Sequence, residues 1–304
     1  MEKLFGVTTA MVTPMNEKGE VNYKELERLT EFLIDKGVNC LYPLGTTGEM
    51  FKLNVNERKK VAETVVNTAQ KRVKVFIHIG AMTLDDTLLL ANHAVSIGAT
   101  GIGAVTPVFF PADDVQIEAY YQAIAEEVPD NFPIYLYSIP QLASNALSLE
   151  VVKRLAANHQ NIVGIKYSYP DFLTLKDYLS VRNNSFSVLT GSDSLFLPAL
   201  AMGCDGVVSG VSCVFPEPFK EIYKLYSEGE LTQARNVQQH ADNIIQILKG
   251  GSNLSYFKKG LELRGIQGGS VKRPQLDLTI EEEKALIENI NSWKRKLSLV
   301  ELLE

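Results

Sequence analysis

The sequence has few features of a secreted, membrane-bound or disulfide-stabilised protein. Its three cysteines, Cys40, Cys204 and Cys213, show no CxxC spacing and predict no disulfide framework, which favours a reducing compartment. No basic-then-apolar signal peptide opens the chain, and no apolar run is long enough to cross a bilayer. We therefore expect a cytoplasmic protein with no membrane partner.

Basic charge and metal-ligand motifs are also scarce. The formal net charge of −6 gives no electrostatic reason to expect nucleic acid as a partner. The four histidines, His78, His93, His159 and His240, have neither HxH nor HExxH spacing, which predicts no metal site. No Gly-rich phosphate-binding turn follows the first strand-like run, at 5–14.

The chain does contain a regular alternation of apolar strand-like runs and longer amphipathic runs. The strand-like runs lie within 5–14 and at 40–44, 73–79, 101–105, 134–138, 162–166, 186–189 and 206–209. Most are rich in Val, Ile and Leu and barely alternate with polar residues, as in strands that are buried on both faces. Eight strand–helix repeats predict an α/β fold of the (β/α)8 TIM-barrel type, and a doubly wound open sheet is the alternative.

The last quarter of the chain shows only helical patterns. They lie at 217–227, 231–249, 253–263 and 280–297, and the first of them is the expected eighth barrel helix. We therefore predict a barrel over residues 1–228. Residues 229–304 form a C-terminal helical appendix that packs on the barrel as part of the same structural unit.

One lysine stands at the end of a buried strand. Lys166 follows the apolar run of the sixth predicted strand, where a charge is costly to bury. A desolvated lysine loses its proton more easily, and the neutral amine can form a Schiff base with a carbonyl compound. Taken alone, this stretch fits a surface lysine at a strand end better.

Polar residues follow other predicted strands, and the C-terminal strand ends of a barrel converge on one face. The turn Gly45-Thr46-Thr47-Gly48-Glu49 offers hydroxyls and backbone N–H groups to a small carboxylate, or it is only a strand-to-helix turn. Tyr137 is a proton carrier or a core tyrosine. Glu49 is expected to be structural. Further strand-end residues are Ser168, Gly191 and Asp193.

These motifs, in this order, resemble the dihydrodipicolinate synthase / N-acetylneuraminate lyase family of class I aldolases. The matching stretches are Gly45-Thr-Thr-Gly-Glu49, Tyr137-Ser-Ile-Pro140, Val163-Gly-Ile-Lys166, Thr106-Pro107, Gly191-Ser-Asp193 and Asp205-Gly206. The resemblance covers nearly the whole chain. Each motif is weak alone, and together they are specific.

The resemblance implies a pyruvate Schiff base on Lys166, with no metal or organic cofactor. It assigns proton transfer to Tyr137, carboxylate binding to Thr46 and Thr47 (Thr46 also in the proton relay), and the pyruvate pocket to the backbone of Val208. Ser168, Gly191 and Asp193 become substrate-binding positions. It also implies small 2-keto acid and aldehyde partners and a homotetramer built as a dimer of dimers.

Two departures bear on the substrate. Leu142 stands where the synthases of this family carry an arginine that binds the aldehyde's carboxylate, and Phe109 replaces a relay tyrosine. Both argue against the lysine-pathway synthase, which remains the alternative to a lyase of 2-keto-3-deoxy sugar acids or sialic acid. The lyase pattern is also imperfect, because Ser194 and Gly210 replace its glutamate and serine. A catalytically inactive ligand-binding barrel is the alternative from another class.

Overall fold

The computed structural model describes residues 1–296 of the 304-residue chain. The predicted helix at 280–297 is described over Ile280–Lys296, and its last residue lies outside the described residues. None of the described helices has the length and apolar character needed to cross a bilayer.

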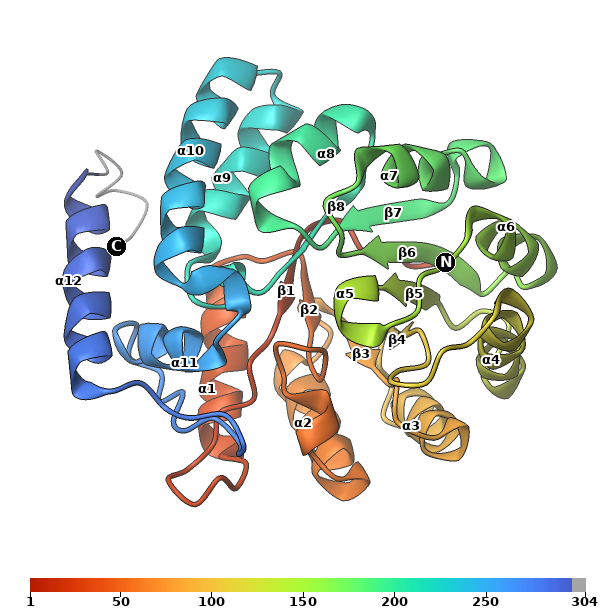
Figure 1. Cartoon of the computed structure of the whole chain (residues 1–304), viewed down its shortest axis with the longest axis horizontal. Helices are drawn as coiled ribbons and strands as arrows, with labels where there is room; N and C mark the ends of the chain where they lie inside the picture. Colours follow the sequence, from red (N-terminus) through yellow and green to blue (C-terminus); the bar gives the residue numbers. More distant parts are fainter. Residues whose placement is uncertain (297–304) are drawn as a thin grey trace.

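Eight parallel strands form a closed barrel in which β1 pairs with both β2 and β8 (Figure 1). The strands are β1 Gly6–Ala10, β2 Cys40–Tyr42, β3 Lys74–His78, β4 Gly101–Val105, β5 Ile134–Ser138, β6 Ile162–Tyr167, β7 Ser187–Thr190 and β8 Gly206–Ser209. All but one of the strand residues are buried, the exception being the half-buried Lys74. The predicted barrel is therefore confirmed and the open sheet is excluded.

Helices surround the barrel in the expected order. They are α1 Tyr23–Asp35, α2 Val55–Ala69, α3 Leu84–Ser96, α4 Asp114–Glu127, α6 Leu149–Asn158, α7 Phe172–Leu179, α8 Phe196–Met202 and α9 Pro216–Ser227. All of them except α8 and α9 begin after a side chain that accepts a hydrogen bond from the first turn, as Asn54 does for α2 and Asp113 for α4. A short helix that the sequence analysis missed, α5 Pro140–Ala143, follows β5.

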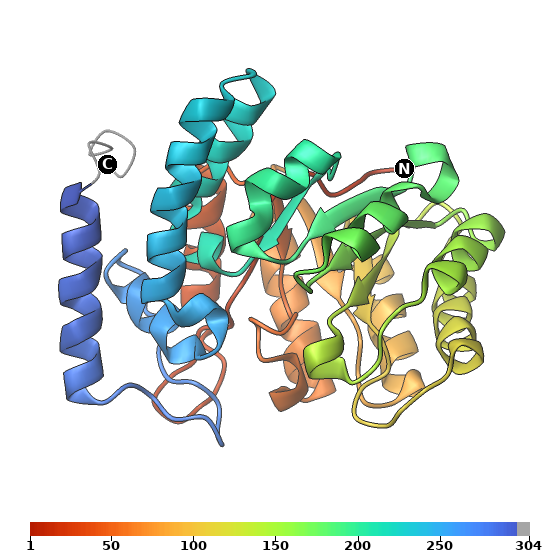
Figure 2. The same cartoon turned by 45° about the horizontal axis from the view of Figure 1, so that its top comes forward.

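Three further helices, α10 Leu231–Ile247, α11 Leu254–Glu262 and α12 Ile280–Lys296, gather on one side of the barrel beside α1 and α9 (Figures 1 and 2). α10 packs along α9, and its Gln238 accepts a hydrogen bond from the backbone N–H of Leu197 at 3.1 Å and donates to the carbonyl of Asp193 at 3.2 Å. The Trp293 indole of α12 donates to the carbonyl of His240 at 3.0 Å. Of these helices, α10 therefore contacts the segment that follows β7, and α12 packs on α10.

Candidate active site

Lys166 lies at the C-terminal end of β6, with only 5% of its surface exposed. In the β5–β6 register it is opposite Tyr137, so the two side chains point to the same side of the barrel. Its Nζ lies 4.0 Å from the centre of the Tyr137 ring and 5.5 Å from that of Tyr42. The lysine is therefore buried among aromatic rings, which stabilise a cation less than a carboxylate would.

Tyr137 is 1% exposed and lies beside the threonine turn. Its hydroxyl is 3.4 Å from the Thr46 hydroxyl, and either oxygen can donate that hydrogen bond. Burial raises the pKa of the phenol, but the Lys166 charge and hydrogen bonding to Thr46 outweigh burial, so the pKa lies below its ordinary value. A phenol with this pKa is suited to exchange protons with its neighbours.

Hydrogen bonds and a close backbone contact fix the turn at Gly45–Glu49. Gly48 donates to the carbonyl of Gly45 at 3.0 Å, and Thr13 donates its hydroxyl proton to the carbonyl of Gly48 at 2.8 Å. A Cβ on Gly48 would meet the backbone nitrogen of Leu44 at 2.9 Å, so the close approach requires glycine. The amides of Thr46 and Thr47 make no hydrogen bond within residues 1–296, which leaves them free for an anion.

Opposite this turn lie polar groups from β6 and β7. A Cβ on Gly191 would lie 1.8 Å from the Ser168 hydroxyl oxygen, so glycine is required there too. Asp193 is half-buried as a residue, yet its Oδ1 is buried and has no hydrogen-bond partner in the described residues, and neither has the Ser168 hydroxyl. Burial raises the pKa of Asp193 to about 6. Because buried polar groups normally have hydrogen-bond partners, these unpaired groups indicate a site where a polar ligand supplies the missing hydrogen bonds.

One cavity of about 860 Å³ is lined by every predicted site residue. These are Thr46, Thr47, Tyr137, Lys166, Ser168, Gly191, Asp193 and Val208. The strand-end residue His78 is not among the lining residues. Burial, and then the charges of Arg58 and Lys166, lower the pKa of His78 well below its ordinary value, so it is a neutral residue behind the site.

Leu142 of α5, which the sequence analysis placed at the position of the synthases' arginine, is 64% exposed and borders the cavity. The cavity also has walls that the sequence analysis did not predict, formed by Phe257 of α11, Lys52 and Gln275. Lys52 follows the threonine turn and forms a charge pair with Glu49 three residues earlier, which was a signal in the sequence. Gln275 lies in an irregular segment, and no sequence pattern could have placed it here.

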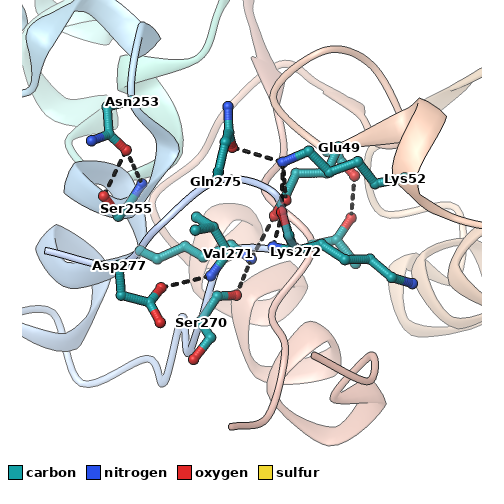
Figure 3. Close-up of polar contacts among 12 residues, drawn as sticks. Glu49, Lys52, Asn253, Ser255, Ser270, Val271, Lys272, Gln275 and Asp277 are labelled. Atoms are coloured by element: carbon teal, nitrogen blue, oxygen red, sulfur yellow. Dashed lines mark hydrogen bonds and ion pairs between the residues drawn. The ribbon is translucent and has the colours of Figure 1, made fainter. Parts of the chain in front are cut away.

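Glu49 has the structural role that was expected of it. Its Oε1 lies 2.7 Å from Nζ of Lys258, and both side chains are almost fully buried. Its Oε2 accepts from Nζ of Lys52 at 2.9 Å and from the backbone N–H of Lys272 at 2.9 Å. Glu49 thereby joins the threonine turn to the segment between α11 and α12 (Figure 3).

Comparison with known proteins decides the family. The model of the "Dihydrodipicolinate synthetase family" matches residues 3–292. The chain belongs to this family. A relative named 4-hydroxy-tetrahydrodipicolinate synthase, from Aquifex aeolicus, is 31% identical over 292 residues, which cover 96% of this chain and 98% of that protein.

Solved structures of dihydrodipicolinate synthetase family folds also match closely. The crystal structure of CdNal from Clostridium difficile with mannosamine has a TM-score of 0.91 at 27% identity, covering 96% of this chain and 100% of that one. A catalytic-lysine mutant of the Ruminococcus gnavus sialic acid aldolase has a TM-score of 0.91 at 26% identity, covering 97% and 99%. The chain is therefore a class I aldolase of this family, whose members differ in substrate.

In the described residues no group of three or more His, Cys, Asp and Glu side chains is arranged to hold a metal ion. The three cysteines are buried and unpaired. Phe109, at the position of the synthase tyrosine, is 73% exposed and does not line the cavity.

Proposed function

We propose that this aldolase forms a Schiff base between Lys166 and a 2-keto acid and cleaves a 2-keto-3-deoxy sugar acid or sialic acid to pyruvate and an aldehyde, or runs the reverse reaction. The observation that carries the proposal is the meeting of Lys166, Tyr137 and the Thr46–Thr47 turn in one cavity. An amine, a proton carrier and a carboxylate site are the parts that this chemistry needs.

The carbonyl carbon of the keto acid reacts first. The uncharged Lys166 amine attacks C2, and the carbinolamine loses water to give an iminium. The C3–C4 bond then breaks, its electron pair moves to the iminium, and the C4 hydroxyl proton leaves as the aldehyde forms. Protonation of the remaining enamine at C3 and addition of water at C2 release pyruvate and restore the amine. No other cofactor is needed for this sequence.

The remaining residues bind and move protons. Tyr137 would carry the proton of the carbinolamine oxygen and of the C4 hydroxyl, helped by Thr46. The free amides of Thr46 and Thr47 would hold the carboxylate, with the backbone of Val208 on the far side of pyruvate. Ser168 and Asp193 would pair with substrate hydroxyls, because the Ser168 hydroxyl and Oδ1 of Asp193 are buried and have no hydrogen-bond partner in the described residues.

The second candidate is a 4-hydroxy-tetrahydrodipicolinate synthase, which would condense pyruvate with aspartate semialdehyde. It is favoured by the names of curated relatives at 31% and 32% identity from Aquifex aeolicus and Hydrogenobaculum. It is disfavoured by the apolar Leu142 on the cavity wall, where a second carboxylate would need a cation.

Borohydride reduction in the presence of pyruvate tests the Schiff base. We expect mass spectrometry to find a reduced pyruvate adduct on the peptide that contains Lys166, and none when pyruvate is omitted. Absence of the adduct would leave the inactive ligand-binding barrel as the better interpretation. Sialic acid, 2-keto-3-deoxygluconate, and pyruvate with aspartate semialdehyde then rank the substrates.

We also propose a cytoplasmic homotetramer. The exposed pair Phe109 and Phe110, 73% and 70% exposed, offers apolar surface that a second copy would cover. The buried, unpaired cysteines fit a reducing compartment. Light scattering at several protein concentrations measures the assembly, and a monomer at all of them would contradict it.

A further inference from the structure

The far wall of the active-site cavity comes from a segment distant in sequence. We call residues 267–278, between α11 and α12, the strap. Gln275 of the strap lines the same cavity as Lys166. Phe51 and Lys52, which follow the threonine turn, line this cavity too. The cavity, at about 860 Å³, is far larger than pyruvate, so this wall borders the space for the remainder of the substrate.

Lys52 would be the obvious group to bind a distal carboxylate, but its hydrogen bonds are already used. Its Nζ donates to Oε2 of Glu49 at 2.9 Å, to the carbonyl of Lys272 at 2.9 Å and to Oε1 of Gln275 at 2.7 Å. An ammonium has three N–H donors, and these three acceptors occupy all of them. Lys52 therefore holds the wall together and is not free to bind a ligand.

The contact with Lys52 sets the orientation of the Gln275 amide. Because an ammonium only donates, the atom that faces Lys52 must be the amide oxygen. The amide nitrogen then points away from the Glu49 network, as the blue atom at the end of Gln275 shows in Figure 3. This Nε2 makes no hydrogen bond to the residues that the structure describes, so two N–H donors remain without a partner on a side chain that lines the cavity.

An ion pair and several hydrogen bonds fix the position of the strap. Buried Lys258 pairs with Glu49 at 2.7 Å and donates to the carbonyl of Ser270 at 2.7 Å, while Glu49 accepts from the backbone of Lys272. Val271 donates its N–H to Asp277 at 2.8 Å (Figure 3). A donor held in this way discriminates between ligands more sharply than one on a mobile loop.

We infer that Gln275 is a specificity-determining residue that donates Nε2–H to a hydroxyl oxygen on the aldehyde-derived end of the substrate. The inference deepens the proposed function and rests on it. Among the lining residues only Lys52 and Lys166 have basic side chains; Lys52 has its three donors in use, and Lys166 forms the proposed Schiff base. The wall thus suits an uncharged, hydroxylated chain and not the second carboxylate of aspartate semialdehyde.

Two variants separate the donor from the contact that holds it. Gln275→Glu keeps an oxygen for Lys52 but removes both N–H donors, and Gln275→Leu removes both functions. Leu276→Ala is the matched control, because Leu276 lies next along the strap, is 63% exposed and does not line the cavity. Each protein is first tested for the reduced pyruvate adduct on Lys166, and then assayed for condensation of pyruvate with D-erythrose or butyraldehyde.

We expect both Gln275 variants to raise the KM for erythrose about fivefold to tenfold, which is the loss of one hydrogen bond, with kcat and the KM for pyruvate unchanged. The KM for butyraldehyde, which has the same chain length without hydroxyls, should not change, and Leu276→Ala should match the wild type for both. Equal changes for the two aldehydes, no change for either, or turnover of neither by an enzyme that forms the adduct would overturn the inference. A wild-type protein that forms no adduct would instead refute the proposed function.

Discussion

Two buried lysines of this protein lie in contrasting electrostatic environments. Lys258 is paired with Glu49 and bonded to the carbonyl of Ser270, so its charge is compensated. Lys166 is buried to a similar degree, yet in the described part of the chain no carboxylate forms an ion pair with it, and its neighbours are the rings of Tyr42 and Tyr137.

The contrast extends to the carboxylates near each lysine. Both oxygens of Glu49 have a cation close by, Oε1 in the ion pair with Lys258 and Oε2 beside Lys52, whereas no cation forms an ion pair with Asp193 in the described residues and its Oδ1 is buried without a hydrogen-bond partner. Buried polar groups normally have partners, and unpaired ones are concentrated where a ligand will supply the missing contact. The contacts of Glu49 thus stabilise the structure, whereas the unpaired groups around Lys166 are suited to binding a substrate.

The largest expected effect comes from the unpaired lysine. Lys166→Ala should lower turnover by ~10⁴-fold or more, because the other amine that lines the cavity, Lys52, is held by hydrogen bonds to three acceptors and cannot replace it. The melting temperature should stay close to that of the wild type, since no ion pair is lost. Turnover comparable to the wild type would refute the role of Lys166.

The paired lysine should show the reverse behaviour. Lys258→Met should lower the free energy of unfolding by about 3–5 kcal/mol, because it leaves Glu49 buried without its main partner. Burial lowers the pKa of Lys258 and Glu49 opposes that shift, which fits a charge kept for pairing. Urea denaturation measures the loss.

Two controls sharpen this result. Lys259→Met, at the adjacent and more exposed lysine, should cost less than about 1 kcal/mol. Adding Glu49→Gln to Lys258→Met should recover part of the loss, because no unpaired charge then remains buried. A Lys258→Met protein as stable as the wild type would mean that the two lysines do not differ as described.

Tyr137→Phe tests the proton carrier next to Lys166. We expect kcat to fall ~10²- to 10³-fold, with the fold intact, because a phenyl ring keeps the packing but cannot exchange protons. Formation of the reducible adduct should slow as well, since the carbinolamine step also needs a proton. Stopped assays with borohydride measure both rates, and wild-type rates would exclude Tyr137 from the relay.

The smallest expected effect concerns Asp193. Its pKa is raised to about 6 in the folded protein, so its proton stabilises the fold below the ordinary pKa near 4, and this stabilisation is lost as the pH rises through 6. Asp193→Asn should therefore be more stable than the wild type by about 1–2 kcal/mol at pH 8, with little difference at pH 4. Melting curves at both pH values test this, and the opposite sign would contradict the raised pKa.

The sequence was sufficient for the barrel because its strands have a simple pattern. Each predicted strand is present, and the errors lie at the ends, where local turns decide. The second strand was expected to run to residue 44 but ends at Tyr42, because Pro43 follows and Leu44 takes a left-handed conformation with φ of 65°. The four-residue helix α5 was missed since it is too short to show a period.

For the site, strand-end residues were predictable and the distant wall was not. Lys166 and Tyr137 lie near the C-terminal ends of buried strands, and the rule that these ends converge brings them together. Gln275 reaches the cavity through an irregular strap whose course depends on Lys258 and on Glu49, a residue more than two hundred positions earlier in the sequence. No local pattern encodes such a path.

The contact between Glu49 and the strap has a consequence for biosynthesis. A ribosome makes the nucleophile more than one hundred residues before it makes Gln275. A nascent chain that has closed its eight strands already carries the reactive amine, but it has no completed wall against which to select an aldehyde. If Gln275 selects the aldehyde as we infer, substrate choice is the last property of the site to be made, and a chain that ends before the strap would lack it while still containing the reactive lysine.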